Sequence, residues 1–186
     1  MRPARAALLM VCLSIIGCGD GPSSPPGNGG TPTGVRDSDR TQELETQYAT
    51  DFRDQRKLSG FSSEIAFGEV VALYRDHPRQ GLPERIYSVR ITQSLKGELS
   101  GTVYVRQLGG HYRDGTFAVV RDSVELRPGH RYLFYGRGAG TLDHPLEIVP
   151  LNGAIEVSGA VSAVSIRASA LVALRHEIEL DLGASD

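Results

Sequence analysis

The feature that most constrains the fold is a series of short β-forming segments between residues 63 and 157, separated by turn signals rather than by helices. The clearest segment is residues 86–95, in which Tyr87, Val89 and Ile91 alternate with polar residues. Such alternation places apolar side chains on one face of a strand and polar side chains on the other. Strands that follow one another without helices between them favour an antiparallel barrel or sandwich.

The other expected strands are also rich in β-forming residues and are bounded by glycine or proline. Residues 64–74 are apolar at both even and odd positions, which predicts a central strand buried on both faces, with Gly68 at a bulge or bend. Residues 76–83 are polar and carry prolines, so we expect a loop there. The further expected strands are residues 102–108, 116–120, 131–135, 146–149 and 154–157.

One helix is expected before the strands. Leu44, Tyr48 and Phe52 fall at i, i+4 and i+8, a spacing that places them on one side of a helix. We therefore expect a helix over residues 40–56, within a polar lead-in that spans 36–60. The alternative is that this lead-in is a partly ordered approach to the domain.

A second helix is expected after the strands. Ala170, Leu174 and Ile178 repeat the same helical spacing near the C-terminus. This pattern predicts an amphipathic helix over residues 165–180, within a C-terminal segment that spans 161–186.

The first 17 residues have the layout of an export signal. Arg2 and Arg5 precede an apolar run over residues 6–17. The run is shorter than the roughly 20 residues of a membrane-spanning helix, but it suits the apolar region of a signal peptide. It ends in Ile15-Ile16-Gly17-Cys18, which resembles the lipobox of bacterial lipoproteins.

The lipobox resemblance implies that residues 1–17 are removed and that the thiol of Cys18 carries diacylglycerol, often with a further acyl chain on the new amine. Acyl burial contributes about 0.8 kcal/mol per CH₂, so two or three chains give a stable anchor. The alternative is an ordinary secretory signal that is cleaved after Gly19. Because position 19 is not Asp, the resemblance favours the outer membrane of a Gram-negative cell. In other bacteria it implies the extracytoplasmic face of the cell membrane.

The segment after Cys18 is predicted to be a flexible linker over residues 18–35. Between positions 19 and 34 it consists of Gly, Pro, Ser, Thr, Asn and Asp and contains no large apolar residue. Such a composition cannot bury enough surface to offset the loss of chain entropy. We expect it to hold a folded domain away from the lipid headgroups.

Charge and cysteine content exclude several classes of function. The chain has 20 basic and 22 acidic residues, and without the two arginines of the signal the balance is 18 to 22, or −4. This balance argues against nucleic-acid binding through bulk charge. The only cysteines are Cys12 and Cys18. The remainder of the chain therefore has no disulfide, zinc–thiolate site, iron–sulfur cluster or cysteine nucleophile.

The order of segments over residues 67–134 carries a second resemblance. Its parts are an apolar strand with an internal glycine (Phe67-Gly68-Glu69-Val70), a strand that ends in Leu95-Lys96-Gly97, and the turn Leu126-Arg127-Pro128-Gly129 before another strand. This order resembles the netrin and tissue-inhibitor-of-metalloproteinase-like OB-fold domains, and also many uncharacterised bacterial exported proteins.

The OB-fold resemblance implies a mainly β fold, a small antiparallel OB-like barrel or sandwich over residues 61–160, with flanking N- and C-terminal helices. The metalloproteinase inhibitors chelate the target zinc through an N-terminal cysteine amine and rely on disulfides. The present domain has neither feature, so the inhibitory mechanism does not carry over.

No catalytic constellation can be recognised, and we expect no catalytic residue, metal or cofactor. His176-Glu177 lacks the second histidine of a zinc-protease motif. The glycine-rich residues 136–140 do not open a helix, which favours a hairpin connection over a phosphate loop. Four of the five histidines are interpreted as loop or turn residues: His77, His111, His130 and His144. The fifth, His176, falls in the helix expected over residues 165–180.

Arginines and tyrosines are the remaining candidates for a ligand-binding surface. If the arginines of the central strands and turns share one face, they would form a basic strip like those with which OB-folds bind extended ligands. The alternative is that they are solvated strand edges, while the tyrosines serve core or rim packing. The residues concerned are Arg106, Arg113, Arg121, Arg127, Arg131 and Arg137, with Tyr87, Tyr104, Tyr132 and Tyr135.

The sequence therefore predicts a membrane-anchored cell-envelope lipoprotein that serves as a non-enzymatic binding or interaction module. Its ligand is not specified, and the class of partner considered is another envelope protein. One alternative is a structural or assembly lipoprotein without a small ligand. Another is an enzyme that uses the scattered histidine and aspartate side chains.

Overall fold

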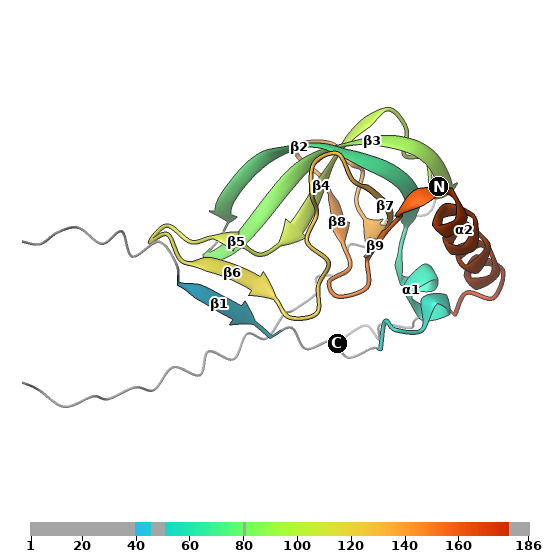
Figure 1. The fold of residues 1–186 in the computed structure, drawn as a ribbon, viewed down its shortest axis with the longest axis horizontal. Coiled ribbons are helices and arrows are strands. Elements are labelled where there is room, and N and C mark those ends of the chain that lie inside the picture. Colours follow the sequence, from blue (N-terminus) through green and yellow to red (C-terminus); the bar gives the residue numbers. More distant parts are fainter. Residues whose placement is uncertain (1–39, 46–50, 80, 179–186) are drawn as a thin grey trace, which may run out of the picture.

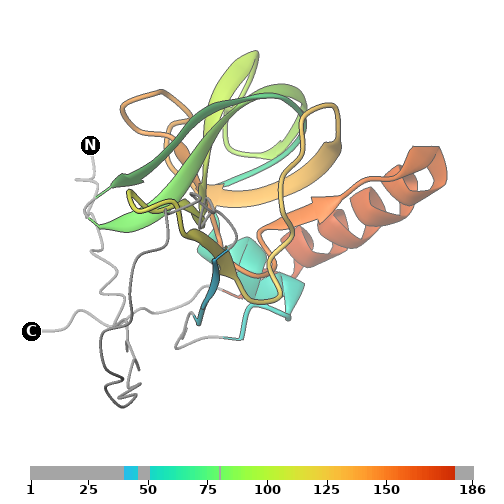
Figure 2. The ribbon, with the colours of Figure 1, turned by 60° about the vertical axis from the view of Figure 1, so that its left-hand side comes forward.

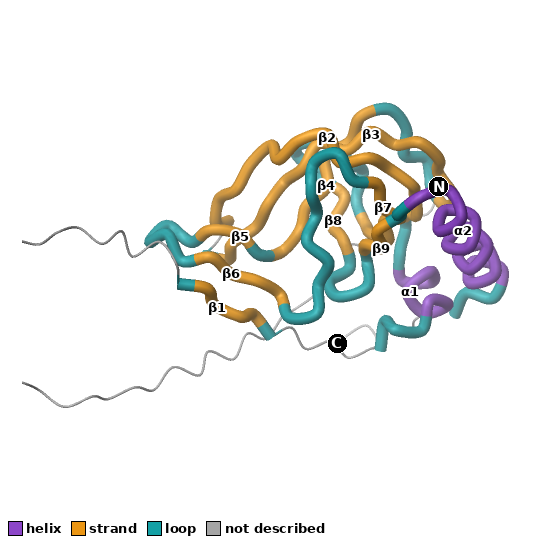
Figure 3. Tube along the Cα trace, in the orientation of Figure 1, coloured by secondary structure: helices purple, strands orange, loops and turns teal. Residues whose placement is uncertain are grey.

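The computed structural model describes residues 40–45, 51–79 and 81–178 and is mainly β, as expected, with two helices (Figure 1). Figure 3 separates the strands of the main body from the helices at one end. The helices are α1 (Gln55–Phe61) and α2 (Gly159–Arg175). The strands are β1 (Thr41–Leu44), β2 (Glu64–Arg79), β3 (Leu82–Lys96), β4 (Thr102–Leu108), β5 (Gly110–His111), β6 (Phe117–Val120), β7 (Arg131–Arg137), β8 (Leu146–Ile148) and β9 (Ala154–Glu156).

Six strands form one sheet in the order β2-β3-β4-β8-β7-β9, and β2 also pairs with β7. Most neighbours are antiparallel, but β4 and β8 are parallel, so a purely antiparallel arrangement is wrong. The reason lies in the strand directions. Because β2 is antiparallel to β7 and β7 is antiparallel to β8, β8 runs the same way as β2 and therefore as β4.

The long β2–β3 hairpin replaces the loop that was expected over residues 76–83. Its pairs run from Ile65 opposite Lys96 to Arg79 opposite Leu82, and the ladder includes Pro78 opposite Pro83. A proline is tolerated in a strand where the ladder does not need its nitrogen as a donor. Register shifts interrupt the pairing at four places, one of them at the expected bulge beside Gly68, and the hairpin curves strongly (Figure 2).

One face of the curved sheet encloses an inner core. Tyr132 and Phe134 of β7 point into it, together with Tyr87 and Val89 of β3. Gly68 lies against this core, where an added Cβ would come within 2.6 Å of Cγ1 of Val89. The close approach explains why the strand carries a glycine here. The buried members are Ala66, Val70, Tyr87, Val89, Leu99, Val103, Val105, Leu126, Tyr132, Phe134, Leu146, Ile148 and Ala154.

The opposite face of β2 and β7 forms an outer core with the two helices (Figure 1). Leu133 and Tyr135 point into this outer core, whereas Tyr132 and Phe134 of the same strand point into the inner core. The helix expected over 165–180 is confirmed in kind, but α2 begins at Gly159 and ends at Arg175. The buried members of the outer core are Phe52, Leu58, Ile65, Leu133, Tyr135, Val149 and Ala170.

A small sheet, β1-β6-β5, replaces the expected N-terminal helix. Residues 41–44 form a strand parallel to β6, and α1 begins later, after its N-cap Asp54. The helix expected over 40–56 is therefore wrong at residues 40–45 and 51–54, whereas residues 55 and 56 are the first two of α1. Residues 46–50 lie outside the described residues. Leu44 is buried against Ala118 and Val120, so strand pairing overrides the helical spacing.

Two buried tyrosines should make the fold sensitive to alkali. Burial raises the pKa of both Tyr87 and Tyr135 to about 12. In the unfolded chain a tyrosine titrates near pH 10. Burial of these two neutral hydroxyls therefore costs the folded state no stability below about pH 10, and the free energy of unfolding decreases as the pH rises towards 12. We expect the midpoint of urea unfolding to fall across this interval, and we expect the hydroxyls of Tyr87 and Tyr135 to ionise only when the chain unfolds.

Tyr135→Phe is the matched control for the alkaline effect. The Tyr135 hydroxyl is buried without a hydrogen-bond partner among the described residues. Its removal should leave stability at neutral pH unchanged or raise it by about 1 kcal/mol, because an unsatisfied polar group disappears. The variant should also lose less stability above about pH 10. An alkaline profile identical to that of the wild type would contradict the assignment.

Candidate functional site

An aromatic pair lies on the surface of the main sheet. Tyr74 of β2 contacts Tyr104 of β4 edge-to-face, with ring centroids 5.0 Å apart. The guanidinium of Arg75 lies 5.8 Å from the centroid of the Tyr74 ring. Val71 and Leu73 are exposed on the same strand segment. We call Val71, Leu73, Tyr74, Arg75 and Tyr104 the tyrosine patch.

The patch follows from the point at which β2 leaves β7. The two strands pair up to Glu69, and backbone bonds to Gly129 and His130 continue this edge as far as Val70. Beyond Val70, none of the described residues pairs with the β2 backbone on the side away from β3. Residues 71–75 are therefore both exposed and open at one edge, an arrangement that invites pairing with another strand.

This exposure corrects part of the expectation for residues 64–74. The segment is largely buried up to Val70, as predicted, but residues 71–74 are exposed, with Val71 at 51% and Tyr74 at 48%. Apolar residues at both even and odd positions indicated burial on both faces, because a central strand normally has neighbours on both sides. Here the neighbour on one side ends, and the sequence pattern does not mark where it does so.

The charges around the patch are mostly compensated. Arg90 pairs with Glu69 at 2.9 Å, and Arg106 contacts both Glu84 and Glu147. Within the described ranges, Arg75 has no carboxylate partner. The patch thus combines two aromatic rings, two aliphatic side chains and one uncompensated guanidinium.

The arginines considered for a basic strip are not brought together. Arg121 forms ion pairs with Glu43 and Glu45 beside β1. Arg137 lies over the ring of Phe61 in α1, 5.1 Å from its centroid. The others differ in surroundings: Arg106 is paired on β4, Arg131 lines a groove beside α2, and Arg113 and Arg127 are exposed.

The expected tyrosines divide between core and surface. Tyr87, Tyr132 and Tyr135 are buried, in agreement with a packing role. Tyr104 is half-buried, and its ring contacts the ring of Tyr74. Tyr74 is a surface tyrosine that the sequence pattern did not predict, because residues 64–74 were expected to be buried on both faces.

Two histidines form isolated pairs with acids. His111 Nδ1 lies 2.5 Å from Asp76, and His130 Nδ1 lies 2.6 Å from Glu156. His144 and His176 are exposed, and the side chain of His77 lies outside the described set. In the described part of the chain, no group of three or more His, Cys, Asp or Glu residues is arranged to hold a metal ion.

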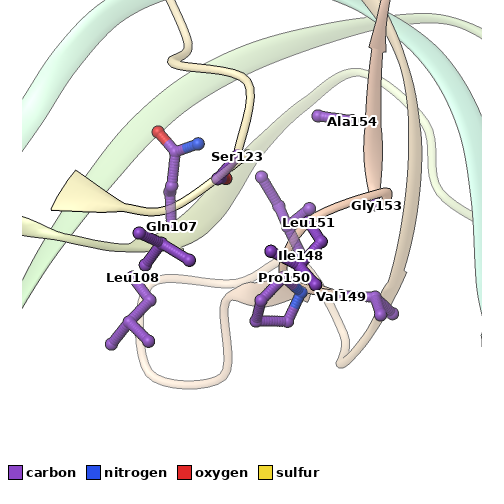
Figure 4. A pocket seen from close by; sticks show the side chains of 10 residues that line it. Gln107, Leu108, Ser123, Ile148, Val149, Pro150, Leu151, Gly153 and Ala154 are labelled. Carbon is purple, nitrogen blue, oxygen red and sulfur yellow. The ribbon is translucent and has the colours of Figure 1, made fainter. Parts of the chain in front are cut away.

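A small cavity lies between the end of β4 and the β8–β9 connection (Figure 4). Its volume is about 10 Å³, close to the minimum for one water molecule. Gln107 on its wall already donates to the carbonyl of Val124 and accepts from the amide of Leu126. The cavity is therefore a packing gap rather than a ligand site.

A larger open groove of about 260 Å³ lies between β2, β3 and the first half of α2. Phe67, Val157 and Val164 form apolar parts of its wall. Arg131 and Arg167 reach it from β7 and α2, respectively. This groove was not anticipated from the sequence, since its walls come from segments far apart in the chain.

Cys18, the expected lipidation site, lies outside the described residues. Neither helix in the described ranges is long and apolar enough to cross a membrane. The chain matches no protein-family model. It also matches no curated protein in sequence. The surface of the domain therefore has to be interpreted from its own chemistry.

Proposed function

We propose that the chain is a bacterial lipoprotein, held at a membrane of the cell envelope by acyl chains on Cys18. The support is the lipobox Ile15-Ile16-Gly17-Cys18 at the end of a signal-like apolar run. The linker over residues 18–35 then separates the anchor from the folded domain. The outer membrane is the proposed location in a Gram-negative cell, and the extracytoplasmic face of the cell membrane in other bacteria.

We further propose that the domain is an OB-like barrel. The strand pairings support this proposal, because they run β2-β3-β4-β8-β7 and return to β2 through the additional pairing. Counted along the chain, β4 is the third of these five strands and β8 is the fifth, and these two strands pair in parallel. The inner core that these strands enclose is also consistent with a barrel interior.

Within this framework the domain is proposed to be a non-enzymatic module that binds an extended segment of another envelope protein. The observation that carries the proposal is the open, apolar edge of β2 at residues 71–75. A partner strand would gain backbone hydrogen bonds at that edge, and its side chains would meet Tyr74 and Leu73. Tyrosine is well suited to such contacts, because it offers a large rigid surface with a polar end.

The experiment expresses the chain in a bacterial envelope with a photo-crosslinking phenylalanine derivative at position 74. We expect a covalent adduct with a protein partner, and the same group at the exposed Ala139 should give none. Leu73→Lys should abolish the adduct, because a lysine on an edge strand opposes strand addition. No adduct at position 74, or equal adducts at both positions, would favour the structural role without a ligand.

The anchor is tested on the same material by the mass of the mature N-terminus. We expect the chain to begin at residue 18 with the added mass of diacylglycerol and an acyl group. Cys18→Ser should eliminate that mass. A mature chain that begins at Asp20, or at an unmodified Cys18, would show that the lipid assignment is wrong.

A further inference from the structure

Helix α2 exposes apolar side chains along one side. Val161, Val164 and Val172 are exposed at 87%, 72% and 57%, respectively. At 100° per residue these three valines and the exposed Ala168 fall within an arc of roughly 80°. Ala170 on the opposite side is buried in the outer core. We call Val161, Val164, Ala168 and Val172 the valine face.

The valine face is bordered by positive charge only. Between Gly159 and Arg175 the helix contains no acidic residue, and its two charged residues are Arg167 and Arg175. Arg131 joins Arg167 at the groove that Val164 also lines. The structure gives none of these three arginines a carboxylate partner among the residues it describes.

Nearby acids are already engaged elsewhere. Glu177, just after the helix, pairs with Lys96 at 2.8 Å. Glu156, just before it, pairs with His130. The unpaired guanidinium groups therefore give this side of the molecule a local positive charge, although the whole chain is mildly acidic.

A row of apolar side chains along one helix face is normally buried, and α2 has such a row on its inner side and another on its outer side. Here the inner side is buried and the outer side is not, which indicates a missing partner. Protein interfaces are enriched in aromatic residues and methionine at their centre, whereas the valine face has only small aliphatic side chains. Short aliphatic groups ringed by arginine fit the boundary of a bilayer, where hydrocarbon lies just beneath anionic headgroups.

We propose that α2 docks flat on an anionic phospholipid surface, with the valine face inserted between headgroups and Arg131, Arg167 and Arg175 contacting lipid phosphates. The proposal gains its context from the lipoprotein function proposed above. Arg40 lies 22 positions after Cys18 in the chain, a separation of at most about 75 Å. An anchored domain can therefore reach the leaflet with α2.

The test uses the mature chain, residues 18–186, with Cys18→Ser so that no acyl chain contributes. This chain is the mature form proposed above, so it lacks only the residues that the signal peptidase would remove. Flotation with phosphatidylglycerol vesicles should recover the protein, and phosphatidylcholine vesicles should recover at least about tenfold less. High salt should release it, because the Debye length falls to about 3 Å at 1 M.

The decisive variants change the helix and nothing else. Val161→Asp/Val164→Asp/Val172→Asp should lower vesicle binding at least tenfold, and Arg167→Gln/Arg175→Gln should lower it several-fold. The control Ser100→Asp/Thr102→Asp/Ala139→Asp adds the same charge at exposed sites outside α2, and it should retain most of the binding. Circular dichroism checks the fold, and Val161→Ser/Val164→Ser/Val172→Ser serves as a milder version.

Two results would overturn the proposal. One is binding that does not distinguish anionic from neutral vesicles or that survives the aspartate variant. The other is a dimer in solution that the aspartate variant dissociates, which would assign the valine face to a second copy. Because the tested chain has no thiol at position 18, these outcomes are independent of whether Cys18 is acylated in cells.

Discussion

Replacing Phe134 with alanine is expected to lower the free energy of unfolding by about 3–5 kcal/mol. Phe134 is fully buried in the inner core, where its ring centroid lies 5.8 Å from that of Tyr132. Its ring edge also comes within 3.3 Å of where a Cβ on Gly68 would lie. The surrounding strands are paired on both sides, so they cannot collapse into the space that the ring leaves.

Urea unfolding followed by circular dichroism measures this loss. Val161→Ala is the control, because the side chain is 87% exposed and its truncation should change stability by no more than about 0.5 kcal/mol. Similar losses for the two variants would show that Phe134 does not occupy a closed core.

Replacing Arg85 with methionine is expected to lower the free energy of unfolding by about 2 kcal/mol and to loosen the small sheet selectively. The buried Arg85 side chain donates to the carbonyl of Gly109 at 3.2 Å and to Glu125 at 2.6 Å. Its guanidinium also lies 5.2 Å from the ring centroid of Phe117. It thereby joins β3 of the main sheet to β6 of the small one.

The cost should come mainly from the lost hydrogen bonds, because Glu125 is half-exposed and can return to water. Hydrogen exchange reports the local effect: the amide of Ala118 should exchange faster, while that of Val89 in the inner core should change little. Glu125→Gln keeps an acceptor and should cost less than about 1 kcal/mol. Equal acceleration at both amides would contradict a local role for Arg85.

Strands with a single buried face could be predicted well from the sequence. Residues 102–108 were expected as a strand, and β4 occupies the same span. The alternation of Tyr87 and Val89 with polar residues was also confirmed, because the inner core requires every second side chain. In such segments the local pattern and the tertiary environment agree.

The predictions that fail concern segments whose structure depends on contacts with distant parts of the chain. Leu44 lies at helical spacing from Phe52, yet its own segment becomes a strand because β6 offers an edge. The tyrosine patch arises because the pairing of β2 with β7 ends at Glu69. The partner of Glu69 in this ladder, Arg131, lies about sixty residues further along the chain. The groove beside α2 likewise combines β2, β3, β7 and α2, and no local pattern encodes that meeting.

The position of β1 has a mechanical consequence. It is the first described strand after the N-terminal segment, so tension applied through that segment reaches the domain at β1. Its four residues pair with β6, and Arg121 forms an ion pair with Glu43 of β1. Under tension the β1–β6 ladder is expected to separate before the main sheet does, which would extend the chain between the proposed anchor and the main sheet and leave the inner core intact.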